Sequence, residues 1–202
     1  NNELQVYLAV LLGAWTVMTV NLVMAADVSS VDSFRLAAFQ AASIGTSTGY
    51  ATADFAAWPI LSKVILLLLM IVGACAGSTS GGLKILRLRI AFQLARREIS
   101  RISSPRKVHL VRMDGEVVED DKLWTIVGML SWWAVIAMAG LLMLSFIEYE
   151  LDLESLIGIV VSSLGNTGPT LGAFGPTQTW SSLHWSSMII TSLMMWLGRL
   201  EL

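Results

Sequence analysis

The chain has 202 residues, of which 55% are hydrophobic and 14% are charged, with a formal net charge of −2 and a mean hydropathy of +0.69. Soluble domains usually carry about 25% charged residues, so this composition excludes an ordinary soluble protein and predicts one embedded in a lipid bilayer. The single cysteine excludes an internal disulfide and multi-cysteine metal sites, and the charge gives no reason to expect a nucleic-acid partner.

Four stretches without a charged residue follow one another along the chain, at residues 4–26, 64–82, 123–147 and 155–198. A membrane-spanning helix needs about 20 apolar residues, so the first three are candidate spans. The fourth is interrupted by glycine and proline near its middle. Because the chain begins with Asn1 and its last apolar stretch stops at Leu202, we expect a piece of a longer membrane protein.

Charge orients these segments. Ten of the 13 Lys and Arg residues lie in residues 84–122, which the positive-inside rule predicts to be cytoplasmic. Residues 84–102 read as a basic helix, and Asp114-Gly115 predicts a hairpin after it. The opposite side carries seven acids against two bases and would attract cations, unless these acids are ordinary solvated loop residues. The acids are Asp27, Asp32, Asp54, Glu148, Glu150, Asp152 and Glu154; the bases are Arg35 and Lys63.

The chain repeats one pattern twice: a long apolar helix, an acidic outer loop, a short apolar helix, a glycine turn and a second long helix. We expect the short helices at about residues 33–43 and 153–164. They lead into Gly-Thr-Ser-Thr-Gly-Tyr at residues 45–50 and Gly-Asn-Thr-Gly-Pro-Thr at residues 165–170, two similar turns 119 positions apart.

The short helices predict a pore. A helix of about 12 residues covers less than about 20 Å and cannot cross a hydrocarbon core of about 30 Å. Irregular backbone at that depth is tolerated only where it lines a water-filled cavity, and rings of carbonyl oxygens there can replace the hydration shell of an alkali cation. The fold class expected is an all-α membrane protein with two helix–pore loop–helix repeats, at residues 1–102 and 122–202, joined by a cytoplasmic connector at residues 103–121.

The chain resembles the Trk/Ktr/HKT superfamily of potassium transporters, especially its Trk-type membrane subunit. The matching stretches are residues 43–52, 73–84, 165–172 and 198–201. The family fold has four such repeats around one pore, and this chain resembles the third and fourth. The resemblance implies multi-pass insertion in the plasma (inner) membrane and channel-like potassium uptake, classed as symport. It also implies a transported potassium ion with no covalent cofactor, a homodimer, and a cytoplasmic ring of nucleotide-binding regulatory subunits.

The resemblance also implies roles for individual residues. The selectivity filter would consist of Ser47, Thr48, Gly49, Asn166, Thr167 and Gly168, with potassium on the carbonyls of Ser47, Thr48, Asn166 and Thr167. An intramembrane gate loop beneath it would include Gly77, Ser78, Thr79, Ser80, Gly81 and Gly82, and Arg199 would face the pore below the filter.

Other interpretations remain open for these residues. The glycine turns can simply end helices, the glycines of residues 73–81 fit a small-residue packing pattern, and Arg199 can pair with Glu201. The basic segment can dock the regulatory subunit or bind anionic lipid. A tandem-pore potassium channel and a transporter permeable to both sodium and potassium are the alternative functions. We expect no enzyme, because Ser78 or Ser80 would need a base at the same depth.

Overall fold

The computed structural model describes residues 2–26, 28–78, 81–103, 112–113, 116–117 and 120–200. This part of the chain is helical except for loops and one pair of two-residue strands, and the predicted all-α class is confirmed. The predicted gate residues Thr79 and Ser80, the acid Asp27 and the hairpin turn Asp114-Gly115 lie outside the described residues.

Two units of three helices repeat the same order. The first contains α1 (Asn2–Ala25), α2 (Ser30–Gly45), the short 3-10 helix η1 (Phe55–Ala57) and α3 (Ile60–Val72). The second contains α5 (Asp120–Ile147), α6 (Leu153–Gly165), η2 (Gly172–Phe174), η3 (Trp180–Ser182) and α7 (Trp185–Arg199). Between them lie α4 (Ile85–Ser103), β1 (Arg112–Met113) and β2 (Glu116–Val117), and the two strands pair antiparallel.

Helix length sets α1 and α5 apart from α2, α3, α6 and α7, which are all shorter. α1 and α5 have 24 and 28 residues, so they measure about 36 and 42 Å, and both are long and apolar enough to cross a membrane. α2 and α6 have 16 and 13 residues, or about 24 and 20 Å. They extend slightly beyond the predicted bounds, yet both stay shorter than the hydrocarbon core of about 30 Å.

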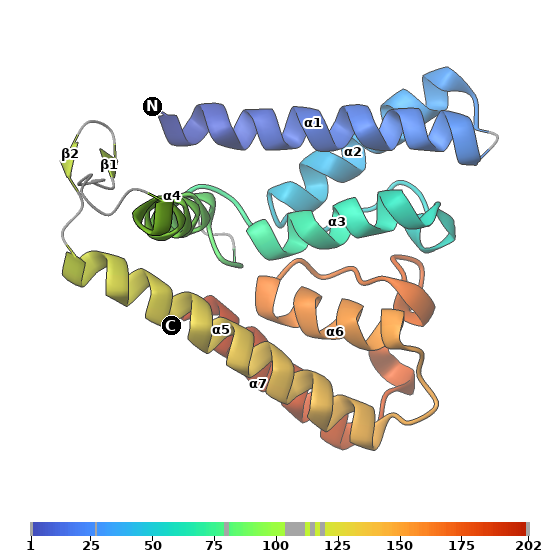
Figure 1. Ribbon diagram of the computed structural model, residues 1–202. Helices are drawn as coiled ribbons and strands as arrows, with labels where there is room; N and C mark the ends of the chain where they lie inside the picture. The colour runs from blue at the N-terminus through green and yellow to red at the C-terminus, as the bar shows by residue number, and fades with distance from the viewer. Residues whose placement is uncertain are drawn as a thin grey trace.

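The two units have separate cores that meet at one interface. In the first, Met18 and Leu22 of α1 pack with Ile44 of α2 and Met70 of α3. In the second, Leu144, Ile159, Leu164 and Met194 join α5, α6 and α7. α3 packs against α6, and Val161 and Leu171 of the second unit belong to the first core. Figure 1 shows the result, with α3 and α6 side by side between the long helices.

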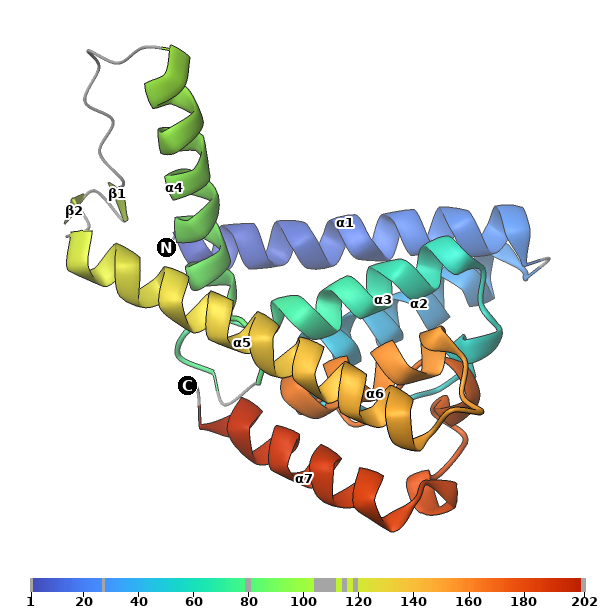
Figure 2. The ribbon, with the colours of Figure 1, turned by 60° about the horizontal axis from the view of Figure 1, so that its bottom comes forward.

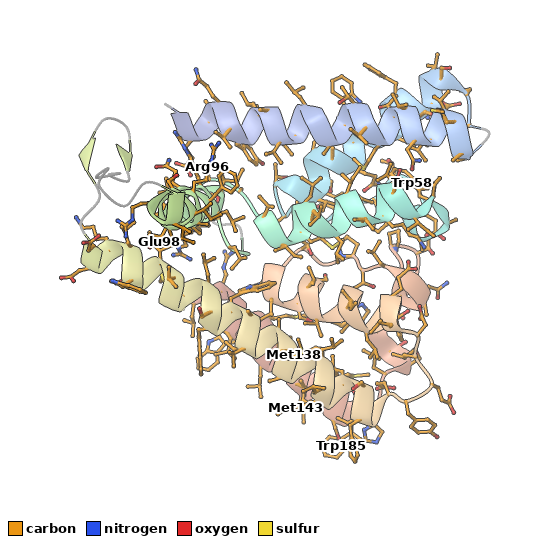
Figure 3. All side chains as sticks on the ribbon, in the orientation of Figure 1. Trp58, Arg96, Glu98, Met138, Met143 and Trp185 are labelled. Atoms are coloured by element: carbon orange, nitrogen blue, oxygen red, sulfur yellow. The ribbon has the colours of Figure 1, made fainter. Side chains whose placement is uncertain are left out.

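The amphipathic helix α4 leaves this bundle. Figure 2 shows it projecting from the end of the molecule where both chain termini lie, and it packs on the start of α5 through Ile90 and Leu123. Arg96 and Glu98 mark this end in Figure 3, while Trp58 and Trp185 lie toward the opposite end. The basic helix therefore lies at one end of the molecule, and its location on the cytoplasmic side stays a prediction from the positive-inside rule.

Candidate functional site: two glycine loops and an interrupted helix

The two short helices end in the same way. After α2, the Thr48 amide donates to the Ser43 carbonyl at 2.9 Å; after α6, the Thr167 amide donates to the Ser162 carbonyl at 3.2 Å. Each bond spans five residues and ties the turn back onto its helix. We call residues 46–50 the first glycine loop and residues 166–170 the second glycine loop. The internal repeat therefore extends to the hydrogen bonds of the backbone.

Both loops also share a pattern of left-handed residues. The φ angle is 54° at Ser47 and 51° at Asn166, and it is 80° at Gly49 and 97° at Gly168. A left-handed conformation costs about 1–2 kcal/mol for residues other than glycine. Such strain persists only where the surrounding structure holds it, and it clusters at functional sites. The loops therefore have one defined shape that occurs twice.

The loops contact each other through Gly49. A Cβ at this position would overlap the carbonyl oxygen of Thr167 and lie 3.2 Å from Cδ of Pro169. Gly168 differs, because a Cβ there would meet nothing within 4 Å. Glycine is thus required at Gly49 by both space and backbone angle, and at Gly168 by the angle alone. The structure brings the two predicted filter segments together.

Side chains of the second loop are used within the protein. The Asn166 Nδ2 donates to the Met195 carbonyl of α7 at 3.1 Å, and the Thr167 hydroxyl donates to Ser162 Oγ at 3.2 Å. In the part of the chain that the structure describes, however, the carbonyl oxygens of Thr48, Asn166 and Thr167 accept no hydrogen bond. The groups that these loops offer to a cation are therefore main-chain oxygens.

The helix after the first loop is interrupted as the sequence predicts. α3 ends at Val72, and α4 begins only at Ile85. Gly73, Gly82 and Lys84 all have positive φ angles, of 64°, 86° and 57°. We call residues 73–84 the interrupting loop. Its left-handed residues stand at its start and its end, where the chain leaves one helix and enters the next.

The interrupting loop lies against the second glycine loop. A Cβ on Gly81 would overlap the carbonyl oxygen of Gly165 and lie 3.2 Å from Nδ2 of Asn166. Gly77, by contrast, is exposed and would have open space around a Cβ. The two glycine loops and the interrupting loop, which the sequence predicts as separate elements, therefore meet.

Arg199 is exposed in the last turn of α7. It follows Gly198, where a Cβ would overlap the Leu164 carbonyl at the end of α6. The residue is therefore near the end of the second short helix, although its direction toward a pore stays a prediction.

The sequence analysis missed a buried cation in the interrupting loop. Only 4% of Lys84 is exposed. Its Nζ donates to the carbonyls of Ala76 at 3.0 Å and Ser78 at 3.4 Å. The Ala76 amide donates in turn to Oε1 of Glu3 at 2.6 Å. Two features of the sequence could have indicated this contact: Lys84 closes a glycine-rich run, and Glu3 is the lone acid at the start of α1.

Several of the outer acids hold the structure together. Lys63 of α3 donates to both carboxylate oxygens of Glu154 at the start of α6, at 2.7 and 2.9 Å. Glu148 accepts a hydrogen bond from the His184 amide at 2.7 Å, and Asp32 pairs with Arg35 at 3.5 Å. These contacts give some outer acids a structural role, and attraction of cations by the remainder stays a prediction.

No group of three or more His, Cys, Asp or Glu side chains that could hold a metal ion occurs among the described residues.

Comparison with known proteins identifies relatives along almost the whole chain. A profile of the TrkH family, described as "Cation transport protein", matches residues 4–202. The chain is 33% identical over 178 residues to "Trk system potassium uptake protein TrkH" of Vibrio parahaemolyticus, covering 86% of this chain and 35% of that protein. It is 32% identical over 173 residues to the protein of the same name from Escherichia coli K12, covering 86% of this chain and 35% of that protein.

A solved structure agrees with these relatives. The crystal structure of the potassium transporter TrkH from Vibrio parahaemolyticus matches with a TM-score of 0.89 and 28% sequence identity. The match covers 98% of this chain and 42% of that one. The chain spans about a third of the length of the curated relatives that it matches.

Proposed function

Because the chain belongs to the TrkH family of cation transport proteins, we propose that it forms half of a pore for channel-like potassium uptake across the plasma membrane. Two observations carry this proposal together. The two glycine loops have the same backbone shape, and the carbonyls of Thr48, Asn166 and Thr167 accept no hydrogen bond from the residues described. Unpaired carbonyls are costly unless water or an ion satisfies them.

In the proposed filter, carbonyls of Ser47, Thr48, Asn166 and Thr167 replace water molecules around a potassium ion. α2 and α6 both end directly before these loops. The C-terminal end of a helix carries roughly half a negative charge, so both short helices would stabilise a cation at the loops without any carboxylate. The membrane potential would drive entry, at about 2.3 kcal/mol per charge for each 100 mV.

The interrupting loop is the proposed gate. Its support is the contact of Gly81 with the end of the second short helix, since a loop at that place would lie on the inner side of the filter. Gly77, Ser78, Thr79, Ser80 and Gly82 complete the proposed gate, and Arg199 would repel cations or hold the loop. Movement of this loop would open the path for the ion.

The resemblance supports further parts of the proposal. The pore would sit in the bilayer of the inner membrane, with residues 84–122 on the cytoplasmic side. A second copy of the protein and a ring of nucleotide-binding regulatory subunits would be its partners. Both long helices expose many apolar side chains, among them Leu12, Val20, Trp132 and Met138, as contact with lipid requires.

The direct test is rescue of potassium uptake in a deficient cell by the full-length parent protein and by its Gly168→Ser variant. A side chain at φ 97° is strained, so we expect the loop to leave this backbone angle, its carbonyls to lose their alignment and the variant to lose potassium preference over sodium. Gly13→Ser is the matched control, because that glycine lies in α1 with nothing within 4 Å of a Cβ.

The outcomes separate the possible functions. Rescue by the parent and by Gly13→Ser, with sodium leakage in Gly168→Ser, would support the filter. Equal flux of sodium and potassium in the parent would indicate a transporter permeable to both ions. No rescue, with the protein present in the membrane and its regulatory partner supplied, would contradict potassium uptake.

A further inference from the structure

One residue of the interrupting loop is held through both of its main-chain polar groups. The amide of Ala76 donates to the Glu3 carboxylate at 2.6 Å, and its carbonyl accepts from the Lys84 ammonium at 3.0 Å. Lys84 also reaches the Ser78 carbonyl at 3.4 Å. An acid from α1 and a base from the far end of the loop thus hold the same residue.

The position of Lys84 is unfavourable without these bonds. Only 4% of the residue is exposed, and burial of an ammonium group is costly unless hydrogen bonds compensate it. Its φ angle of 57° adds the strain of a left-handed residue with a side chain. Glycine at position 84 would avoid that strain, so the advantage of lysine there lies in its ammonium group.

Glu3 stands on a helix that also holds the end of α2. One turn after Glu3, the Tyr7 hydroxyl donates to the Gly45 carbonyl at 3.1 Å. Residues four apart share one face of a helix, so this face of α1 contacts both the interrupting loop and the helix end before the first glycine loop. At its other side the interrupting loop meets the second glycine loop through Gly81.

We propose that Glu3 and Lys84 clamp Ala76, one through its amide and the other through its carbonyl, and thereby hold the interrupting loop across the ion path. They are positioning residues: they touch the loop and not the ion. The inference rests on the proposed gate and adds the groups that keep it in place. Loss of the clamp should free the loop and raise potassium flux in the resting protein, while the filter and its ion preference stay unchanged.

The test compares Lys84→Met with Lys84→Arg in the full-length parent reconstituted into vesicles. Both variants keep the strained backbone, but only arginine keeps a charged donor. A hydrogen bond to a charged group is worth about 1.5–3 kcal/mol, so Lys84→Met should raise resting flux by about tenfold or more. Lys84→Arg should restore most of the closure. Arg35→Met, which removes an exposed outer charge, should behave as the parent.

Glu3 provides an independent second arm. Glu3→Ala should also raise the resting flux, while Glu3→Gln keeps a carbonyl acceptor and should raise it less. If both side chains hold the same residue, the effects of Glu3→Ala and Lys84→Met will not add in the double variant. Additive effects would contradict a shared clamp.

Folding is monitored separately. Membrane abundance is measured for each variant, and the labelling rate of the Cys75 thiol, beside Ala76, reports whether the loop has loosened. Lys84→Gly removes the ammonium and also relieves the strained φ angle, so it should fold and still leak. Parent-like flux in folded Lys84→Gly and Lys84→Met would overturn the clamp, even though parent uptake upholds the proposed function. A parent that transports no potassium would overturn both.

Discussion

Gly49 and Gly168 occupy equivalent places in the two repeats but meet different constraints. Both have positive φ angles, yet only Gly49 has the backbone of the other loop where its Cβ would stand. Backbone cannot move aside as the tip of a flexible side chain can. At the scale of residues, Gly49 is therefore required by the contact between the two repeats and by its own backbone angle. Gly168 is required only by the backbone angle of its own loop.

This difference predicts unequal effects of the same substitution. Gly168→Ala should lower stability by about 1–2 kcal/mol, which is the strain alone. Gly49→Ala should add overpacking of about 1–3 kcal/mol to that strain. Thermal unfolding of the purified full-length parent and variants in detergent measures both. A larger loss for Gly168→Ala would show that the contact between the loops is wrong.

At the scale of elements, the close approach of α7 to the end of α6 depends on Gly198. A Cβ there would overlap the Leu164 carbonyl, one residue before α6 ends. In the first unit, Gly73 follows the last residue of α3, 13 residues after the start of that helix at Ile60, and Gly198 stands 13 residues after the start of α7 at Trp185. The same position thus interrupts the helix in one repeat and permits close packing in the other.

We predict that Gly198→Ala pushes α7 away from α6 and lowers stability by about 1–3 kcal/mol. Gly128→Ala is the matched control, since Gly128 lies in helix α5 with open space around it. It should raise stability by about 0.5–1 kcal/mol through higher helix propensity. Opposite shifts in melting temperature are therefore expected, and a stabilising Gly198→Ala would disprove the close approach.

Elements with a local pattern could be predicted from the sequence. The apolar run and the glycine turn set the second short helix at 153–164, against Leu153–Gly165 in the structure. The glycine-rich run likewise indicated where α3 stops. The contacts of Glu3 with Ala76 and of Lys63 with Glu154 could not be predicted, because they join residues 73 and 91 positions apart. Such pairs depend on how the helices pack against one another, and the spacing of residues along the sequence does not determine that packing.

At the scale of the whole molecule, the ion pair between Lys63 and Glu154 ties the two units at their outer end. The side chains are 16% and 37% exposed, so water screens the pair only in part. It also lies beside a cavity of about 150 Å³ lined by Ile60, Val64, Leu67, Ile157 and Leu171. The pair therefore closes an otherwise apolar gap between α3 and α6.

Removing one partner should weaken the joint between the units. Lys63→Met leaves Glu154 without its cation, and we expect a loss of about 1 kcal/mol, the upper range for a partly exposed pair. The exchanged pair Lys63→Glu with Glu154→Lys should recover part of this loss. Melting temperatures of the full-length protein give the comparison, and a variant Lys63→Met as stable as the parent would assign the joint to the apolar contacts alone.

The departure of α4 from the bundle has a mechanical consequence. α4 has 19 residues, or about 28 Å, and it begins one residue after Lys84. A helix of that length is stiff, and its first residue directly follows the interrupting loop. Ile90 and Leu94 of α4 pack with Leu123 of α5, and Arg97 pairs with Asp120 at 3.3 Å, so a displacement of the start of α5 would tilt α4 and pull on the backbone of Lys84.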